Sequence, residues 1–239
     1  MNKIEYGPKL DFSNVLIRPK RSTINSRSEV DLNRTFKFKY SSYDWTGVPI
    51  ISANMDTTGT FQVHESLKKH NIITALHKFY NKDDYLQQNN DGRLDPDYFM
   101  VSTGIGEGSI EKLLDIQNVL PFKWICIDIA NGYINKLVEF CKKVRSTFPE
   151  HRIIAGNVVT REMVEELILE GKVDGVKVGI GPGAACTTRI KTGVGMPQLS
   201  AIIECSDAAH GVGGLIIGDG GITCPGDMSK AFGGGADFV

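Results

Sequence analysis

WICIDIANGYINKLVEFCKKVRSTFPEHRIIAGNVVTREMVEELILEGKVDGVKVGIG, residues 124–181, is the stretch that decides the fold. Its three short β-branched, apolar runs, WICIDIA (124–130), RIIAGNV (152–158) and GVKVGIG (175–181), are typical of buried strands. Between them, apolar residues recur at helical spacing: Ile134, Leu137, Val138, Cys141 and Val144 in one segment, and Met163, Val164, Leu167 and Ile168, behind a candidate N-cap at Thr160, in the other. Strand and helix therefore alternate, which predicts parallel βαβ units.

The same alternation continues on both sides of this stretch, with a spacing of about 25 residues between successive strands. Five further runs of this kind are VPIISAN (48–54), IITALHK (72–78), YFMVSTG (98–104), GLIIGDG (214–220) and GADFV (235–239). The runs are apolar on both faces, as buried parallel strands are, and most end in Gly, Asn, Asp or Lys. Eight such units predict an α/β fold, a (β/α)8 TIM barrel, with a doubly wound open sheet as the alternative.

The chain is interpreted as one domain over residues 1–239, because no low-complexity linker interrupts it. Residues 1–47 precede the first predicted strand. The last run begins the eighth strand, so we expect a barrel that is C-terminally truncated within that strand, without its closing loop and helix. The long irregular stretch GPGAACTTRIKTGVGMP (181–197) is the candidate active-site loop, because long loops after barrel strands carry function.

Composition excludes several classes of protein. The 27 Lys and Arg against 28 Asp and Glu give a net charge of −1, which leaves no excess basic field for nucleic acid or an anionic membrane. The short basic stretch at residues 18–30 is therefore interpreted as a solvated face. No apolar run approaches the ~18 residues of a membrane-spanning helix, and the start lacks a secretory signal, so we expect a cytoplasmic protein.

Cys186 is the candidate nucleophile among the five cysteines. The cysteines are odd in number and lack C-x-x-C spacing, which argues against a disulfide framework or a zinc site. Cys186 lies in GIGPGAACTTR, a glycine-rich loop in which exposure and backbone dipoles favour the thiolate. The alternative is a small buried apolar residue, which is how we interpret Cys126, Cys141, Cys205 and Cys224.

Asp219 in GDGGI (218–222) is the candidate binder of a vicinal diol. Most of the 26 glycines lie in the last third of the chain, where backbone N–H groups can approach an anion closely. The Asp219 carboxylate can accept two hydrogen bonds while the N–H groups of Gly220 and Gly221 face a phosphate. The alternative is a plain turn, because Asp-Gly is a common turn dipeptide.

Three further polar residues end predicted strands. Asp128 and Asn157 follow the fourth and fifth runs, where they either face a ligand or cap the next helix. Lys78 follows the second run beside His77 and either reaches a polar ligand or remains a solvated rim residue.

Taken together, these segments resemble the IMP dehydrogenase and GMP reductase family, with a closer similarity to its reductase branch. The resemblance covers essentially the whole chain. Its motifs are LDFSNVLIRPKRSTINSRSEVDL, ANMDTTGTF, HKFY, DIANGY, AGNVVT, VKVGIGPGAACTTR, TGVGMPQLSA and GDGGI. The chain runs directly from HKFY to the third strand, whereas the dehydrogenases carry regulatory modules there.

The resemblance implies NADPH-dependent reduction of GMP to IMP and ammonia, a reaction of purine nucleotide interconversion. Cys186 would attack C2 of the purine to give a covalent thioimidate, and Thr188 would handle the proton for the departing ammonia. Asp219 would hold the ribose hydroxyls, with Gly220 and Gly221 beside the phosphate.

The resemblance also implies a cofactor site, a cation site and an assembly. Residues that would line the NADPH site are Lys78, Asp128, Ile129, Ala130, Ile180 and Gly181. Ser26 and Arg27 would reach that site from a neighbouring subunit of a homotetramer, where a guanidinium suits the 2′-phosphate. Groups that would surround a monovalent cation such as potassium are the carbonyls of Gly181, Gly183 and Cys186, with Arg189 nearby.

Two departures from the family pattern keep other interpretations open. The family has Ser where this chain has Ala184, and its second phosphate loop and its flap would follow Val239. One alternative is an IMP dehydrogenase without its regulatory insert, which would use NAD and hydrolyse the same adduct. The other is a nucleotide-binding protein without catalytic activity.

Overall fold

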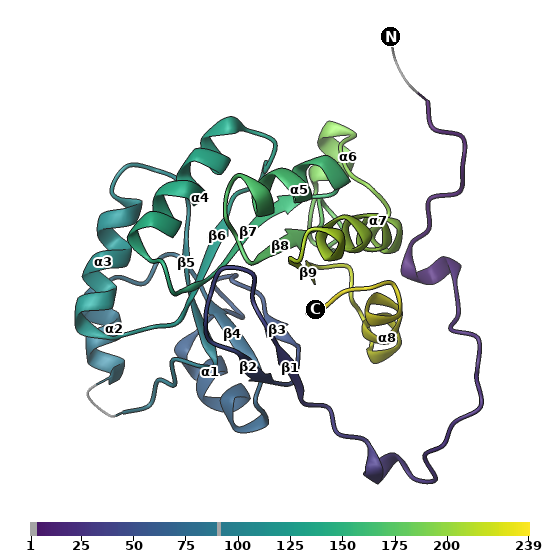
Figure 1. Ribbon diagram of the computed structural model, residues 1–239, viewed down its shortest axis with the longest axis horizontal. Coiled ribbons are helices and arrows are strands. Elements are labelled where there is room, and N and C mark those ends of the chain that lie inside the picture. Colours follow the sequence, from purple (N-terminus) through teal and green to yellow (C-terminus); the bar gives the residue numbers. More distant parts are fainter. Residues whose placement is uncertain (1–3, 90–91) are drawn as a thin grey trace.

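The computed structural model describes residues 4–89 and 92–239 and shows a curled, parallel β-sheet surrounded by helices (Figure 1). Within these residues, consecutive strands pair in parallel and in chain order. The sheet strands are β3 (Ile51–Ser52), β4 (Ile73–Leu76), β5 (Phe99–Thr103), β6 (Trp124–Asp128), β7 (Arg152–Val158), β8 (Gly175–Val178) and β9 (Leu215–Gly218). Each coincides with a predicted run, and the strand order confirms the α/β barrel rather than an open doubly wound sheet.

Residues 237–239 occupy the eighth position of the barrel. Phe238 bridges Ile217 of β9 in parallel, and the Gly218 N–H donates to the Phe238 carbonyl at 2.8 Å. On the other side, Ile51 of β3 donates to the Val239 carbonyl at 2.8 Å. These hydrogen bonds join the last strand of the sheet to the first. The expectations of a single domain and of further structure after Val239 stay predictions.

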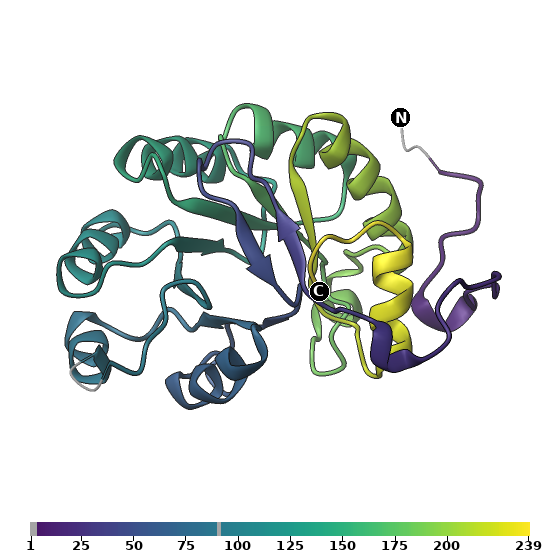
Figure 2. The same cartoon turned by 60° about the horizontal axis from the view of Figure 1, so that its bottom comes forward.

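The helices lie outside the sheet and follow the predicted segments (Figure 2). In α4, the buried face contains Leu137, Val138, Cys141 and Val144 of the predicted set, together with Phe140. The fifth predicted residue, Ile134, is instead exposed at the N-cap. Thr160 precedes α5 as predicted, but its side chain makes no capping bond, because its hydroxyl lies 3.2 Å from the Tyr133 hydroxyl. The helices are α1 (Phe61–Leu67), α2 (Lys82–Asn89), α3 (Ser109–Val119), α4 (Asn135–Thr147), α5 (Arg161–Leu169), α6 (Thr188–Thr192), α7 (Gln198–Gly211) and α8 (Pro225–Gly233), with single 3₁₀ turns η1 (Phe12–Asn14), η2 (Arg27–Glu29) and η3 (Lys68–His70).

An antiparallel hairpin, β1 (Arg34–Phe36) and β2 (Trp45–Gly47), covers the N-terminal end of the barrel. Trp45 packs against Trp124 and Phe238, with ring centroids 5.9 Å and 5.5 Å apart. These rings belong to an apolar cluster inside the barrel, separate from the larger core between strands and helices. The hairpin was not predicted. It leaves the opposite, C-terminal end of the barrel as the accessible one.

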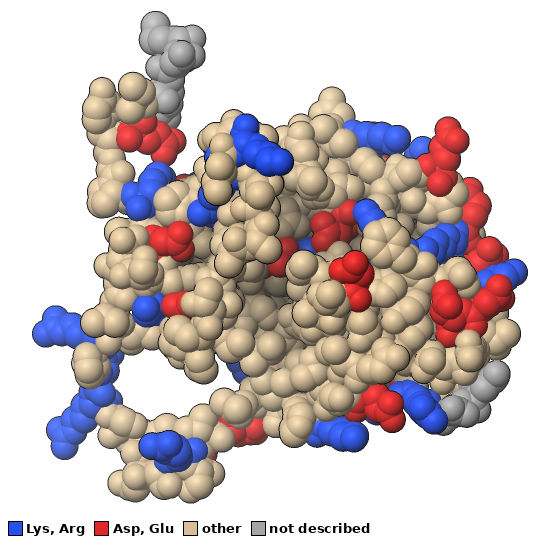
Figure 3. Space-filling view, turned by 180° about the vertical axis from the view of Figure 1, so that it is seen from behind, with Lys and Arg blue, Asp and Glu red and all other residues tan. Residues whose placement is uncertain are grey.

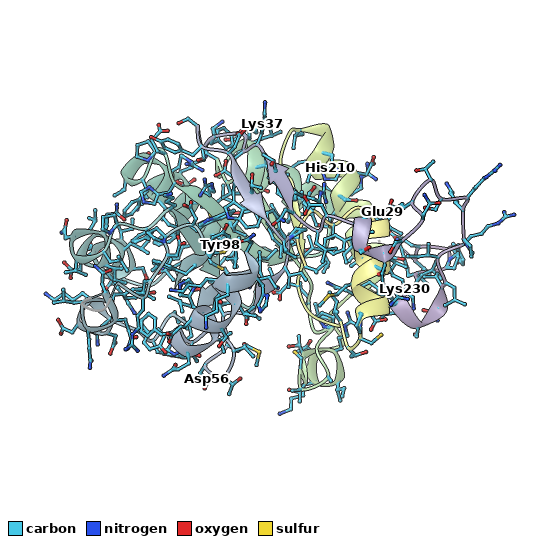
Figure 4. The ribbon with its side chains drawn as sticks, turned by 90° about the horizontal axis from the view of Figure 1, so that it is seen from below. Glu29, Lys37, Asp56, Tyr98, His210 and Lys230 are labelled. Carbon is cyan, nitrogen blue, oxygen red and sulfur yellow. The ribbon has the colours of Figure 1, made fainter. Side chains whose placement is uncertain are left out.

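Hydrogen bonds anchor the rest of the N-terminal region on both sides of an exposed segment. The buried carboxylate of Asp174 accepts hydrogen bonds from the backbone N–H of Tyr40 at 2.8 Å and from Arg145 at 2.6 Å. Lys230 of α8 donates to the Phe12 carbonyl at 2.8 Å, which holds η1 against this helix (Figure 4). Between these anchors, residues 16–33 form an exposed arm that extends beyond the barrel (Figure 1).

Among the described residues, no helix is both long enough and apolar enough to cross a membrane.

Candidate active site

A cavity of about 410 Å³ opens at the C-terminal end of the barrel. Seen from behind, the molecule is hollowed near its centre (Figure 3). The cavity takes its walls from strand ends and from the loops that follow them, and its polar lining includes Asn54, Asn157, Lys177, Cys186 and Asp219. A site at this end is what a parallel barrel provides, because the carboxyl ends of all strands converge there.

Lys177 of β8 is the charged centre of the site. Its ammonium lies 2.6 Å from Asp128 Oδ2 and 3.1 Å from Asp219 Oδ2. It also donates to the Asn54 side-chain carbonyl at 3.0 Å. Strands β6, β8 and β9 therefore bring two carboxylates, separated by about ninety residues in the sequence, onto one buried cation.

The two charges shift each other's ionisation. Burial alone lowers the pKa of Lys177, but the negative charges of Asp219 and Asp128 outweigh that effect and raise it. Burial likewise raises the pKa of Asp219, whereas the Lys177 charge and a hydrogen bond from Asn157 bring it below its ordinary value of 3.8. Both groups are consequently ionised at neutral pH.

Asn157 and Gln198 fix the position of Asp219. Asn157 Nδ2 donates to Asp219 Oδ2 at 2.7 Å and to the Gly179 carbonyl at 2.9 Å. Gln198, fully buried at the start of α7, donates to the Val178 carbonyl at 2.8 Å and to the Asp219 carbonyl at 3.2 Å. The ends of β8 and β9 are thus held together by two amide side chains.

Cys186 is exposed in the loop between β8 and α6, and it lines the cavity. Its Sγ lies 3.2 Å from the Thr188 hydroxyl. Hydrogen bonds from the side chain and backbone of Thr188 lower the pKa of this thiol. An accessible thiol with a stabilised thiolate is a nucleophile. The structure thus shows an exposed Cys186, and the alternative of a buried apolar residue is wrong. The role of Cys186 as the nucleophile stays a prediction.

Arg189 braces the base of this loop. Its guanidinium donates to the Ile180 carbonyl at 3.0 Å and to the Met196 carbonyl at 2.5 Å. The two ends of the loop, residues 180 and 196, are therefore tied together through one side chain.

The loop after β9 packs against the cysteine loop. Gly220 and Gly221 have φ angles of 85° and 75°, a region that favours glycine. A Cβ added at either residue would lie only 3.2 Å or 3.1 Å from Pro182. Glycine at both positions thus lets the two loops pack closely beside Asp219. GDGGI therefore does more than form a plain turn, which was the alternative interpretation of this segment.

Asp128 and Asn157 are not helix caps. The Asp128 carboxylate is bound to Lys177 and to Asn54 Nδ2, the latter at 2.6 Å. Asn157 points to Asp219, and α5 starts only after Thr160. The capping alternative fails for both residues because the interior cation and its partners already engage these side chains.

The other predicted ligand-binding residues lie farther from this centre. Ile129 is half-buried and Ala130 exposed directly after Asp128, while Ile180 is buried beneath the cysteine loop. Lys78 is exposed after β4, with its Nζ 5.9 Å from the centre of the Phe79 ring. Ser26 and Arg27 lie on the exposed arm at η2, and neither residue lines this chain's own cavity.

Sequence reasoning missed Lys177, Asn54 and Gln198. Lys177 stands inside the predicted strand 175–181, which we described as apolar on both faces. A lysine in the middle of such a run is itself a signal, because a buried lysine needs carboxylate partners. Cys224 was also misjudged, since it is exposed.

Comparison with known proteins places this site in context. The model of the IMP dehydrogenase / GMP reductase domain matches residues 9–239. A GMP reductase of Photobacterium profundum is 61% identical over 240 residues, an alignment that covers 99% of this chain and 69% of that protein. GMP reductase 1 of Homo sapiens is 56% identical over 240 residues, covering 100% of this chain and 69% of the human protein.

The fold is also found in a solved structure. The crystal structure of inosine 5′-monophosphate dehydrogenase from Legionella pneumophila superposes with a TM-score of 0.84 at 31% sequence identity. That superposition covers 97% of this chain and 68% of the dehydrogenase chain.

Proposed function

The chain belongs to the IMP dehydrogenase / GMP reductase family, and on that premise we propose that it is a GMP reductase, an NADPH-dependent oxidoreductase that converts GMP to IMP and ammonia. The observation that carries this proposal is the exposed Cys186 thiol, which lines the same cavity as Asp219 and contacts Thr188. A nucleophile and a diol acceptor in one cavity suit a reaction at the base of a nucleotide.

The first half of the reaction forms a covalent bond to Cys186. The thiolate attacks C2 of guanine, and the bond between C2 and the exocyclic amino group then breaks. The amino group needs a proton to leave as ammonia, and Thr188 is the hydroxyl beside the reacting sulfur that handles it. The product is a thioimidate on Cys186. The lowered pKa of Cys186 supports this step, because it raises the fraction of thiolate at neutral pH.

The second half releases IMP. NADPH, when bound, supplies a hydride to C2. The bond between C2 and Sγ then breaks, and the electron pair returns to Cys186 as thiolate. In total, GMP, NADPH and a proton give IMP, NADP⁺ and ammonia. Splitting the reaction at one covalent adduct separates the loss of ammonia from the reduction.

Asp219, Gly220 and Gly221 are proposed to hold the substrate. The Asp219 carboxylate is ionised and fixed by Asn157, which suits it to accept hydrogen bonds from two ribose hydroxyls. The N–H groups of Gly220 and Gly221 lie where backbone can approach a phosphate closely.

The residues present fit NADPH. Asp128 keeps 26% of its side chain exposed beside Lys177, so its carboxylate remains accessible to a ribose. Residues proposed to complete the site are Lys78, Ile129, Ala130, Ile180 and Gly181. Ser26 and Arg27 are proposed to belong to a neighbouring subunit's site, since both are exposed on an arm away from this chain's cavity.

The cysteine loop also fits a monovalent cation such as potassium. Residues 179–187 contain no carboxylate, so neutral carbonyls are the available ligands, as suits a singly charged ion. The proposed ligands are the carbonyls of Gly181, Gly183 and Cys186, beside Arg189. The Gly183 carbonyl accepts one hydrogen bond, from Cys186 N–H at 3.0 Å, and its second lone pair stays open for the cation.

We further propose a cytoplasmic homotetramer. A nucleophilic thiol has to stay reduced, which a reducing compartment ensures. The exposed arm gives each subunit a segment that reaches outward to a neighbour.

The test is turnover of the purified protein with GMP and NADPH, monitored by NADPH absorbance and by release of IMP and ammonia. Cys186→Ala is expected to abolish turnover and to keep GMP affinity within about tenfold, because it removes the covalent step and little binding surface. Cys224→Ala, the other exposed cysteine, is the matched control and keeps its activity. Turnover by Cys186→Ala would refute the mechanism. NAD reduction with IMP would instead identify a dehydrogenase.

A further inference from the structure

The Lys177 ammonium is surrounded by three side chains of the site. It donates hydrogen bonds to Asp128 at 2.6 Å and to Asn54 at 3.0 Å, and it forms an ion pair with Asp219 at 3.1 Å. An ammonium has three N–H donors and no acceptor, so these contacts engage Lys177 with the residues of the site. A role of Lys177 in the reaction is therefore expected to act through the groups that it binds.

The two carboxylates share the same arrangement. All the hydrogen bonds that described side chains make with them end on Oδ2: Asn54 and Lys177 bind that atom of Asp128, while Asn157 and Lys177 contact that atom of Asp219. The side chains of Asp128 and Asp219 remain 26% and 22% exposed. Each carboxylate is thus held by one oxygen and keeps the other for a hydroxyl group.

The proposed function gives these carboxylates to different ligands. Asp219 binds the ribose of GMP, and Asp128 binds a ribose of NADPH. Both carboxylates have to be ionised to accept hydrogen bonds from the two ligands at the same time. Two carboxylates that share one site do not both ionise readily without a cation between them, because like charges repel at low dielectric. Lys177 is that cation, and the neighbouring Cys126 is a buried neutral thiol whose pKa is raised to about 12 by burial.

We propose that Lys177 is a positioning residue that keeps Asp128 and Asp219 ionised together, and so allows the substrate and the cofactor to be bound at the same time. This inference rests on the proposed function for the identity of the two ligands. It predicts that without Lys177 the carboxylates share one proton. GMP binding at Asp219 then drives the proton onto Asp128 and weakens cofactor binding, and the converse holds by reciprocity.

The experiment measures this antagonism with ligands that cannot complete turnover. GMP is titrated calorimetrically into the wild type, Lys177→Met and Lys177→Arg, with and without saturating NADP⁺, at pH 6.5 and 8.5. In Lys177→Met we expect NADP⁺ to weaken GMP binding by about tenfold or more relative to its effect on the wild type, and less at the higher pH. Lys177→Arg keeps the charge and is expected to behave as the wild type. Lys143→Met, an exposed lysine of α4, is the matched control.

An unchanged effect of NADP⁺ in Lys177→Met would overturn the inference. If that variant does not fold, Lys177→Met combined with Asp128→Asn removes one carboxylate with the cation. We expect this double variant to fold and to bind GMP within about tenfold of the wild type, with no pH dependence between 6.5 and 8.5. Loss of GMP binding in it would mean that Lys177 contacts the substrate directly, which also contradicts the proposal.

A ligand-free measurement separates this inference from the proposed function. Carbon NMR of labelled aspartate follows the carboxyl titrations directly. Lys177→Met should raise the pKa of one carboxyl of the pair well above the ordinary 3.8. Ordinary titration of both carboxyls would refute the role of Lys177 even if the protein reduces GMP. If the wild type bound neither GMP nor NADP⁺, the proposed function would fail and the carboxyl titration would still decide the inference.

Discussion

At the scale of single residues, the reactivity of Cys186 depends on the hydroxyl of Thr188, 3.2 Å from its sulfur. We predict that Thr188→Ala slows release of ammonia far more than hydride transfer, because only the first step expels the amino group. The same change should raise the pKa of Cys186, since the Thr188 hydrogen bond is the main cause of its lowering. Rapid-quench assay of ammonia, and single-turnover reduction of the preformed adduct, measure the two steps.

Thr187→Ala is the control for this prediction, because Thr187 is an exposed neighbour whose side chain makes no capping bond to α6. Equal slowing of both steps in Thr188→Ala would argue against a special role for its hydroxyl.

Ala184 is exposed in the cysteine loop, at the position where the family resemblance implies Ser. A hydroxyl that donates to a phosphate contributes about 1.5–3 kcal/mol when nothing replaces it, and water or backbone amides recover part of that energy. We therefore predict that Ala184→Ser tightens GMP binding by about three- to thirtyfold. Turnover at saturating GMP should change little, because the phosphate is remote from C2. Calorimetric titration checks this, and equal affinities would show that the backbone already satisfies the phosphate.

At the scale of elements, His64 holds α1 against the loop before β5. It is fully buried, with Nδ1 3.2 Å from the Tyr98 carbonyl and Nε2 3.2 Å from the Asp95 N–H, which it accepts. This arrangement requires the neutral imidazole. Burial lowers the pKa of His64 from 6.5 to about 4.

Because the folded pKa lies below the unfolded one, the unfolded state takes up the proton first as pH falls. His64 should therefore reduce the free energy of unfolding by about 2–3 kcal/mol between pH 6.5 and 4. We predict that His64→Gln, which can keep both hydrogen bonds, gives a shallower pH dependence of urea unfolding over this range. His70→Gln, at an exposed histidine of η3, is the control. Parallel slopes for His64→Gln and the wild type would contradict the prediction.

The sequence predicted the elements that repeat and missed those that depend on distant contacts. All eight apolar runs become strands or, for residues 235–239, take the eighth position, because burial between helices demands continuous apolar residues. The hairpin β1–β2 escaped detection because each strand has only three residues. Its Trp45 packs against Trp124 and Phe238, which lie far away in the chain.

The candidate site follows the same division. Local sequence motifs were enough to find Cys186, Asp219 and the paired glycines Gly220 and Gly221. The structure places all of them at the cavity or beside it. No local motif identifies Lys177, because its partners are the carboxylates of Asp128 on β6 and Asp219 after β9. Only the folded barrel brings these residues together.

At the scale of the whole molecule, the exposed arm carries Ser26 and Arg27 away from their own barrel. We predict that Arg27→Ala lowers the preference for NADPH over NADH by roughly ten- to a hundredfold. A charge-assisted contact to the 2′-phosphate contributes about 1.5–3 kcal/mol, which corresponds to that ratio. The ratio of kcat/KM values for the two cofactors measures it. Arg21→Ala, an exposed arginine of the same arm, is the control, and an unchanged ratio in Arg27→Ala would exclude Arg27 from the cofactor site.

Hydrogen bonds join residues 49–51 to Val239 and close the barrel. Each of the other sheet pairings connects strands that are neighbours in the chain, so the conformational entropy lost in closing each of those loops is modest. Joining β3 to Val239 closes a far longer loop, residues 51–239, and contacts between such distant residues form slowly. We therefore predict that the strands pair in chain order and that the contact between β3 and Val239 forms last. The same contact should be the first part of the sheet to open. Native-state amide exchange should accordingly show Ile51 and Val239 exchanging before Ile125 and Ile154 in the middle of the sheet.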